Sequence, residues 1–527
     1  MIKAVTDWIE DRTGLVSGVE HFLDEDIPAS SGWHQVFGSV ALFLLMLQIM
    51  TGILLALNYA PTPGEAYQSL RYILLEVTGG KTIRGLHHWG ASLMIIIVVL
   101  HMVQVFIYGA YKKPREATWI VGVFLLLLTL AFGLTGYLLP WDNRAYWGTV
   151  VTTQIAGTAP LIGDLTKDLM GAREAVGAVT FSRFYIVHVL VLPLFTLALV
   201  GAHIFLVRRH GVAAQAGDEA RPKQKFFPGQ VWKDTVAIFF AFAGLYALAL
   251  FAKVPLERMA DPTDASYIPR PEWYFLFLFE LLKYFEGPLE VIGTVVLPGL
   301  ATLALLLTPF IDRQKVVPLA KRAVAVAAVA LGALAWGGLT WAASKGTPAP
   351  QTKLVVDYAE PTPWLALSAD EVASVGYYRQ GGCAKCHTGG QHPLVKSSTR
   401  EKEWLVEHFK KEGTVGPLKE FQLNAMANAF REMDNNQRAS FDHAPELAVT
   451  GAIVFHSKRC SACHVINASG NSVGPPLNGV SRRRKADFVA SLIRNPQAMT
   501  PGSQMPPTKL SSEEMEALVA YLFALEP

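Results

Sequence analysis

Cysteine is scarce in this sequence, with only four among 527 residues. All four belong to two CxxCH motifs, CAKCH at 383–387 and CSACH at 460–464. No cysteine is therefore left to hold an iron–sulfur cluster in this chain. Charge is also sparse, at 17% of residues with a net charge of +3, and no basic run indicates nucleic-acid binding.

Each CxxCH motif is typical of a covalently attached c-type haem. The two thiols bond the vinyl groups of the haem, and the histidine fills one axial position of the iron. Two copies outside the apolar part of the chain predict two haems c. The residues expected to hold them are Cys383, Cys386 and His387 in the first motif and Cys460, Cys463 and His464 in the second.

Apolar residues are abundant, at 51% of the chain, and gather in runs long enough to cross a lipid bilayer. Seven spans are expected, at 34–58, 87–109, 118–139, 184–207, 235–255, 291–310 and 321–343. Lys and Arg concentrate after the second, fourth and sixth spans, which predicts that these loops and the N-terminus face the cytoplasm. The C-terminal tail then lies on the outer side of a bacterial inner membrane, where covalent haem attachment takes place.

Four histidines lie inside two of these apolar spans. His87 and His101 are fourteen residues apart, and His188 and His203 are fifteen apart. Fourteen residues are almost four helical turns, so each pair shares one helix face, ~21 Å apart along the axis. Imidazoles are unfavourable in hydrocarbon unless they bind something. The pattern predicts two non-covalent haems b, His87 with His188 near the outer surface and His101 with His203 near the cytoplasmic one.

Glycines repeat with the same spacing in two neighbouring spans. Gly38 and Gly52 are fourteen residues apart, as are Gly122 and Gly136. Glycine lets a flat macrocycle or another backbone come close, so we expect these positions to make room for the two haems. Ordinary helix packing is the alternative interpretation.

The chain divides by composition into several parts. The first 33 residues predict an amphipathic surface segment and no cleavable signal peptide. The tail contains an internal repeat, in which EVASVGYYRQGGCAKCH corresponds to PELAVTGAIVFHSKRCSACH and EKEWLVEHF to KADFVASLI. We expect an all-α protein with a surface segment (1–33), a four-helix haem-binding domain (34–225), a three-helix domain (226–343), a linker (344–365) and two haem c domains (366–445 and 446–527).

Two further motifs suggest a family. With the loop GYLLPWDNRAYWGT (136–149) and the segment PEWYFLFLFELLKYF (271–285), residues 30–343 resemble cytochrome b of the bc1/b6f family. The histidine intervals and RFYIVH at 183–188 are similar to the b6f form, here with its subunit IV fused to the same chain. The tail is similar to tandem class I cytochromes c.

The resemblance implies a quinol:cytochrome c oxidoreductase subunit. Quinol would be oxidised at an outer site with a Rieske iron–sulfur partner, and electrons would pass through two b haems to a quinone near the cytoplasm. Other electrons would pass through the c haems to a soluble or membrane acceptor, with proton translocation and a homodimer in the lipid membrane. A di-haem b anchor of a dehydrogenase and a non-enzymatic electron conduit are the alternatives.

The resemblance also implies residue roles at the quinone sites. Glu272 would accept a quinol proton, while Tyr274, Pro140 and Trp141 would shape the pocket; simple helix capping is the alternative for Glu272. Lys233 and Asp234 would serve the cytoplasmic quinone, although Lys233 also fits an ordinary membrane anchor. Val36 stands where the b6f form has a cysteine, so no covalent extra haem is expected there.

Further haem contacts follow from the same comparison. Four arginines at helix ends would neutralise haem propionates: Arg84, Arg183, Arg115 and Arg208. Positive-inside anchoring is the alternative for Arg115 and Arg208. Met505, in PGSQMPP, would be the sixth ligand of the second c haem, with an ordinary surface-loop methionine as the alternative. For the first c haem the candidates are Met426, Met433, His392 and His408, or no ligand at all.

Overall fold

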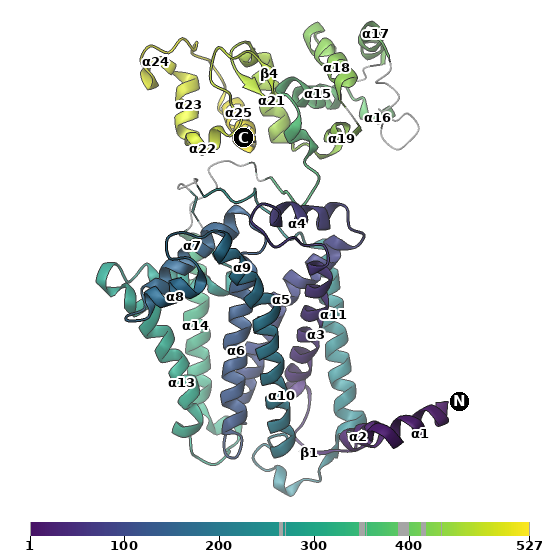
Figure 1. Cartoon of the computed structure of the whole chain (residues 1–527), viewed down its shortest axis with the longest axis vertical. Coiled ribbons are helices and arrows are strands. Elements are labelled where there is room, and N and C mark those ends of the chain that lie inside the picture. Colours follow the sequence, from purple (N-terminus) through teal and green to yellow (C-terminus); the bar gives the residue numbers. More distant parts are fainter. Residues whose placement is uncertain are drawn as a thin grey trace. The chain divides into compact units, whose positions relative to one another are not determined.

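The computed structural model describes residues 2–262, 267–268, 270–346, 354, 356–387, 400–412, 418–433 and 435–525. The chain forms two compact units, Met1–Thr347 and Pro348–Pro527 (Figure 1). This boundary falls inside the linker expected at 344–365. Each unit has its own core and is described by itself below.

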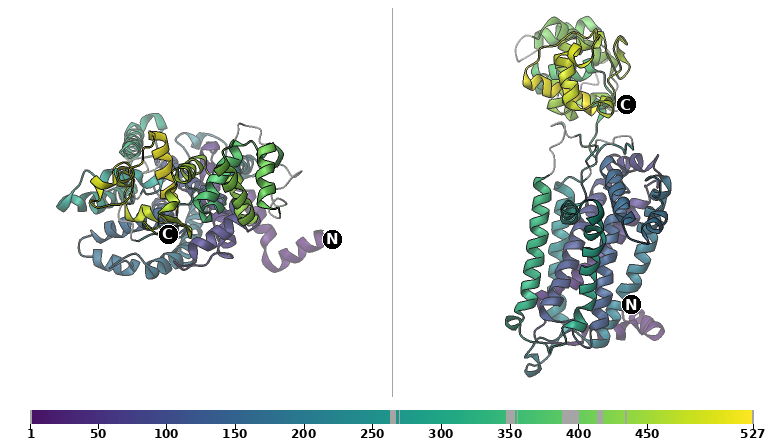
Figure 2. Two further views of the ribbon diagram at one scale, coloured as in Figure 1. Left: turned by 90° about the horizontal axis from the view of Figure 1, so that it is seen from above. Right: turned by 90° about the vertical axis from the view of Figure 1, so that its left-hand side faces the viewer.

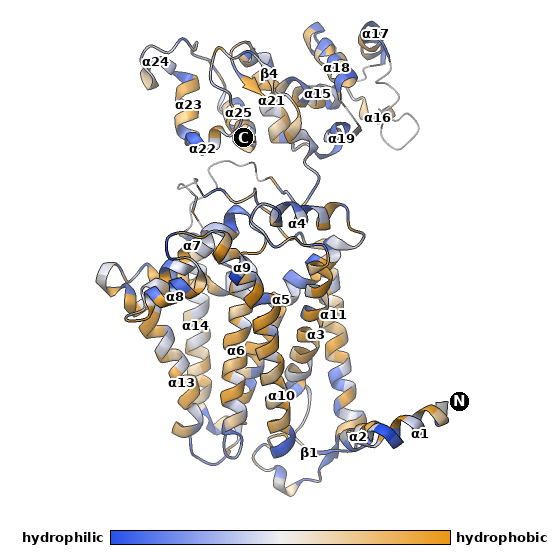
Figure 3. Cartoon of the chain, in the orientation of Figure 1, coloured by the Kyte–Doolittle hydropathy of each residue, from blue (hydrophilic) through white to orange (hydrophobic). Residues whose placement is uncertain are grey.

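Seven helices of the first unit, within the described residues, are long and apolar enough to cross a membrane. They run side by side as one bundle (Figures 1 and 2), and apolar residues dominate α3, α6 and α10 (Figure 3). The seven expected spans are therefore confirmed. Their bounds are Trp33–Ala56 (η1 and α3), Gly80–Tyr108 (α5), Glu116–Tyr137 (α6), Ala178–His210 (α9, η2 and α10), Phe226–Phe251 (η4 and α11), Ile292–Ile311 (η7 and α13) and Ala323–Lys345 (α14).

Several helices start earlier than the apolar runs indicate. The α5 helix begins at Gly80 because its first turns carry the polar residues Lys81 and Arg84, which a hydropathy window leaves out. The α9–α10 helix contains a π-helical turn, Val187–Val191. Pro193 follows within α10 and has no backbone N–H to donate, which favours such a widened turn one turn earlier. His188 lies in this turn.

The bundle is built from two helix groups. The α3 (Val36–Ala56), α5 and α11 (Val231–Phe251) helices pack together, and α10 (Leu192–His210) packs on α6. The α13 helix (Leu297–Ile311) also contacts α6, and the short α12 (Leu276–Leu282) packs on α14. The helices that carry the paired histidines, α5 and the continuous α9–η2–α10 helix, thus each have a glycine-bearing neighbour, α3 and α6.

Short elements cover the two ends of the bundle. One end carries α4 (Ala66–Leu75), α7 (Asn143–Gly157) and α8 (Gly163–Met170) (Figure 1). At the other end β1 (Asp26–Ile27) pairs antiparallel with β2 (Gln224–Lys225). The N-terminal segment forms two helices, α1 (Ile2–Thr13) and α2 (Leu15–Leu23), because Gly14 between them has a positive φ of 61°.

The second unit repeats one helical arrangement. In the first half α15 (Ala369–Gln380) packs on α18 (Glu420–Glu432), and in the second half α21 (Glu446–Ser457) packs on α25 (Ser512–Ala524). The repeated segments 401–409 and 485–493 form α17 (Lys402–Glu412) and α23 (Ala486–Arg494). The remaining elements are α16 (Ala384–His387), α19 (Asn435–Arg438), α20 (Ser440–His443), β3 (Val465–Ile466), β4 (Ser469–Gly470), α22 (Val480–Arg483) and α24 (Pro496–Met499).

The two halves of the second unit share one hydrophobic core. The α15 and α21 helices pack against each other, and a single buried cluster extends from Trp364 to Leu525. Gly376 permits this contact, since a Cβ there would lie 2.4 Å from Cδ1 of Ile453. The two CxxCH segments are therefore tandem in sequence but joined in one compact unit.

Candidate functional site

His87 and His188 face each other inside the helix bundle. Their ring centroids are 6.4 Å apart and their planes cross at 70°. Two imidazoles that each bind one metal ion at about 2.0 Å place their ring centres about 6 Å apart. The pair therefore fits bis-histidine ligation of one haem iron.

Threonine hydroxyl groups orient both rings. Oγ1 of Thr51 donates to the carbonyl of Leu47 and lies 3.0 Å from Nδ1 of His87. Oγ1 of Thr135 donates to Ala131 in the same way and lies 3.0 Å from Nδ1 of His188. Because each hydroxyl hydrogen is already used, the oxygen accepts from Nδ1–H, which leaves the Nε2 lone pair for the metal. These threonines were not predicted from the sequence, although the dipeptide Thr-Gly recurs at 51–52 and 135–136.

The second histidine pair has a related environment. Nδ1 of His101 and Nδ1 of His203 are buried and form no hydrogen bond within the described residues. A glycine of the neighbouring helix faces each of these rings, and ligation of a haem by this pair stays a prediction.

The four repeated glycines each face one of these histidines. A Cβ at Gly38 or Gly122 would lie 3.5 Å from Cε1 of His101 or His203, respectively. A Cβ at Gly52 would lie 3.3 Å from Cε1 of His87, and one at Gly136 only 2.6 Å from Cε1 of His188. The glycines thus make room for the imidazole rings themselves, and clearance for the haem planes stays a prediction.

The four arginines expected beside haem propionates all bind groups of the protein. Arg84 is buried and donates to the carbonyls of Val254 and Pro255, at 3.0 and 3.1 Å. The others reach carbonyls or a carboxylate: Arg115 binds His210 and Gly211, Arg183 binds Asp168 and Leu169, and Arg208 pairs with Glu25. Their contact with propionates stays a prediction.

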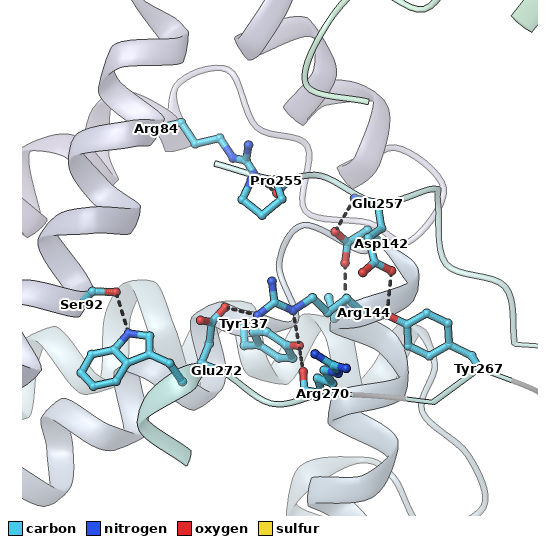
Figure 4. A network of polar contacts seen from close by, with 12 residues as sticks. Arg84, Ser92, Tyr137, Asp142, Arg144, Pro255, Glu257, Tyr267, Arg270 and Glu272 are labelled. Atoms are coloured by element: carbon cyan, nitrogen blue, oxygen red, sulfur yellow. Dashed lines mark hydrogen bonds and ion pairs between the residues drawn. The ribbon is translucent and has the colours of Figure 1, made fainter. Parts of the chain in front are cut away.

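Glu272 forms an ion pair across two segments of the first unit. It precedes the turn η5 (Trp273–Phe275) that leads into α12, and its Oε1 lies 3.2 Å from Nη2 of Arg144 on α7. Nε of Arg144 donates to the hydroxyl of Tyr137 at 3.2 Å, and that hydroxyl donates to the carbonyl of Arg270 at 2.8 Å (Figure 4). Arg144 was not predicted from the sequence, and it lies 128 residues from its partner.

Tyr274 and the two expected wall residues occupy different surroundings. Tyr274 is buried against Gly133, where a Cβ would lie 2.8 Å from the tyrosine hydroxyl oxygen. Trp141 is also buried, with φ of 50°, and its ring stands edge-on to Phe181 at 5.0 Å. Pro140 is half-buried in the turn before it.

A buried acidic group anchors this end of the bundle. Oδ1 of Asp142 accepts from the N–H of Ala145 and so caps α7, while its Oδ2 accepts from the N–H of Glu257 at 3.1 Å (Figure 4). Burial raises the pKa of Asp142. Burial likewise raises the pKa of Glu257, whose carboxylate accepts from the hydroxyl of Tyr267 at 2.7 Å. These contacts join the segment before Glu272 to the start of α7.

An open pocket of about 270 Å³ lies between α7 and α12. Its lining is mostly apolar, with one basic and one acidic side chain. The lining residues are Val151, Gln154, Ile155, Phe279, Leu282, Lys283 and Glu290. Glu272 and Tyr274 lie directly before α12, which supplies one wall of this pocket.

At the other end of the bundle, Asp234 and Lys233 lie in the first turn of α11, and both are half-buried. Oδ1 of Asp234 accepts from Nε2 of Gln230 at 2.9 Å. Val36 is buried at the start of α3. Contact of Asp234 and Lys233 with a quinone stays a prediction.

The second CxxCH motif has a well-ordered histidine. Nδ1 of His464 donates to the carbonyl of Pro475 at 2.9 Å, which leaves Nε2 for a metal. A Cβ at Gly474 would lie 2.6 Å from Cε1 of the same ring, so the glycine is needed for this approach. Burial raises the pKa of the Cys460 thiol to about 11. Met505 is half-buried and packs against the core of the unit.

The first CxxCH motif ends in α16. Among the candidate ligands opposite it, His392 lies outside the described residues. Met426 and Met433 are enclosed in the core, with 0% and 2% of their surface accessible. His408 lies in α17, half-exposed.

Membrane-spanning helices with paired histidines, joined to a tail with two CxxCH motifs, define an integral membrane protein of haem-based electron transfer. Family models agree: Cytochrome b/b6/petB matches residues 24–211, Cytochrome b(C-terminal)/b6/petD matches 259–359, and Cytochrome c matches 448–526. The chain is 37% identical over 319 residues to a cytochrome bc complex cytochrome b subunit of Chlorobaculum thiosulfatiphilum, covering 59% of this chain and 74% of that protein.

The chain therefore belongs to the cytochrome b subunits of cytochrome bc complexes, with a cytochrome c part on the same chain. It is 40% identical over 221 residues to a menaquinol:cytochrome c reductase cytochrome b subunit of Geobacillus thermodenitrificans, covering 40% of this chain and 99% of that one. A solved hyperthermophilic respiratory Complex III aligns with a TM-score of 0.59 and 30% identity, over 66% of this chain and 92% of that one. Membership in these families implies haem b and haem c, as the motifs predicted.

Proposed function

We propose that this chain is the b-type subunit, with a built-in dihaem cytochrome c, of a quinol:cytochrome c oxidoreductase in a bacterial cytoplasmic membrane. The observation that carries the proposal is the carboxylate of Glu272, paired with Arg144, directly before a helix that lines an apolar pocket. An apolar pocket with a few polar groups suits a quinol ring. The relative named for menaquinol supports a quinol substrate.

In this proposal Glu272 accepts a proton from the quinol hydroxyl. A carboxylate is suited to this because it can turn between a bound substrate and water near the membrane surface. Arg144 holds the carboxylate in place through the 3.2 Å ion pair, and the hydroxyl of Tyr137, at the end of α6, accepts a hydrogen bond from the guanidinium. Tyr274, packed against Gly133, would shape the wall of the site together with Pro140 and Trp141, whose ring packs edge-on against Phe181.

His87 with His188 and His101 with His203 would hold two haems b, and the two CxxCH motifs would hold two haems c. When bound, these groups supply one-electron carriers across the membrane and toward an outer acceptor. Because the four cysteines are used by the CxxCH motifs, an iron–sulfur partner of the Rieske type must come from another chain. Asp234 and Lys233 at the opposite end would deliver protons to a second quinone, in a homodimer.

The test is oxidant-induced reduction in isolated membranes. With quinol present and the cytoplasmic quinone site inhibited, an oxidant of haem c is added while the absorbance of haem b is followed. We expect haem b to become transiently reduced while haem c becomes oxidised, because the two electrons of the quinol separate. If haem b stays unchanged or is oxidised together with haem c, the chain is a linear anchor or conduit, and Glu272 has no role of this kind.

A further inference from the structure

A second histidine faces the first CxxCH motif. The ring centroids of His387, in α16, and His408, in α17, are 6.1 Å apart, and the planes cross at 80°. This matches the His87–His188 pair inside the membrane unit, at 6.4 Å and 70°. Both separations fit one metal ion between two imidazoles, each about 2.0 Å from the ion.

Aromatic stacking holds His408 in this orientation. The ring of Trp404 stacks on it with centroids 5.0 Å apart and an interplanar angle of 7°. The guanidinium of Arg400 lies 4.9 Å from the centre of the Trp404 ring. A ligand ring needs such support, because each supporting contact limits its rotation.

The internal repeat shows that His408 is particular to the first half. Aligning 401–409 with 485–493 pairs Trp404 with Phe488. The guanidinium of Arg484 lies 5.2 Å from the centre of the Phe488 ring, which corresponds to the 4.9 Å between Arg400 and Trp404. The same alignment places Leu492 opposite His408. The second half therefore keeps the stacked cation but has no ligand at this position, and it has a methionine in PGSQMPP.

The methionines of the first half do not compete with His408. Met426 and Met433 have 0% and 2% of their surface accessible and pack into the common core. His387, His464 and Met505 are all partly accessible. A ligand must present its donor atom to the prosthetic group, and protein atoms enclose both of these sulfurs.

We propose that His408 is the second axial ligand of the haem held by Cys383 and Cys386, opposite His387. This inference rests on the proposed haem attachment at that motif. The first c haem is then bis-histidine and the second His–Met. Because a methionine ligand raises the reduction potential, the first haem has the lower potential, and electrons leave the chain through the second.

The experiment uses the purified full-length holoprotein and needs no turnover. A pyridine haemochrome assay first counts covalent haem, and two haems c per chain are expected. Fewer than two would mean that haem is not attached at both motifs, which overturns the attachment itself. With two haems c present, we expect the near-infrared absorption band of methionine–iron(III) ligation to have the intensity of one methionine-ligated haem per chain. We also expect that the reduced c haems bind no carbon monoxide. A band for both haems, or carbon monoxide binding, overturns the assignment of His408.

Variants separate ligation from folding. His408→Ala should make one c haem high-spin and able to bind carbon monoxide, and His408→Met should raise the lower c-haem potential and double the methionine band. His443→Ala, an exposed histidine of the same half, should change neither. Spectra of His408→Ala identical to those of the wild type would refute the proposal. If neither variant at position 408 folds, the intensity of the methionine band in the wild-type protein decides whether one or both c haems have a methionine ligand.

Discussion

Replacing Gly136 by alanine tests the histidine pair most directly. The added Cβ would lie 2.6 Å from Cε1 of His188, whereas carbon contacts are most favourable at about 3.5–4.0 Å. The ring must therefore move by about 1 Å, yet the Thr135 hydroxyl holds Nδ1 at 3.0 Å and Phe132 stands edge-on at 5.4 Å. Overpacking of this kind destabilises a folded site by about 1–3 kcal/mol. If this free energy is lost from the haem-bound state, the haem is bound about 5- to 150-fold more weakly.

The same chain supplies a graded control series. Gly122→Ala places its Cβ 3.5 Å from the His203 ring, an ordinary contact, and Gly52→Ala is intermediate at 3.3 Å from His87. Haem b content and the two midpoint potentials are measured by reduced-minus-oxidised spectra during a redox titration. We expect loss or a shifted potential at one haem b in Gly136→Ala, and nearly wild-type behaviour in Gly122→Ala. Equal losses in both variants, or no change in Gly136→Ala, would refute the steric reasoning.

Three further perturbations follow from single contacts. Arg144→Gln should lower quinol turnover about 10- to 100-fold at unchanged haem content, because Glu272 loses the cation that positions it. Thr135→Val should weaken haem binding by about 1 kcal/mol and raise the midpoint potential of one haem b, because the imidazole loses its acceptor at 3.0 Å and becomes less basic. Burial alone would raise the pKa of Asp312, but hydrogen bonds from Lys112 and a neighbouring tyrosine outweigh it and lower that pKa. Asp312→Asn should therefore destabilise the protein by about 1–2 kcal/mol at neutral pH in thermal melts, and this difference should vanish as pH falls below 3.8 through the lowered pKa.

Each of these predictions has a matched control. Adding Arg144→Gln to Glu272→Gln should cause no further loss, whereas additive losses would show that the two residues act separately. Thr129→Val removes a hydroxyl of the same helix that donates to the carbonyl of Leu125, and it should leave both haem potentials unchanged. For the acid dependence, a constant difference between wild type and Asp312→Asn from neutral to acid pH would show that the charge of Asp312 is not the stabilising group.

Local sequence determined the architecture. Each membrane span is one run of apolar residues, and helical periodicity alone puts His87 and His101 on one face, so no contact between distant segments was needed to predict them. The CxxCH motifs are also local, since both thiols and the histidine lie within five residues. For the same reason the seven membrane-spanning helices and the resemblance to cytochromes b and c were predicted correctly from the sequence.

Tertiary structure alone decided which groups meet. The repeated glycines were expected to make room for the haems, and this stays a prediction; the packing of α3 on α5 and of α6 on α10 brings the same glycines against the histidine rings, which the sequence did not indicate. Arg144 and Glu272 are 128 residues apart, and neither residue carries a local sign of the other. His408 was one of four equal candidates until the fold of the second unit placed it 6.1 Å from His387 and enclosed the methionines. Periodicity and motifs report on neighbours along the chain, whereas a ligand or ion pair formed between helices depends on how those helices pack.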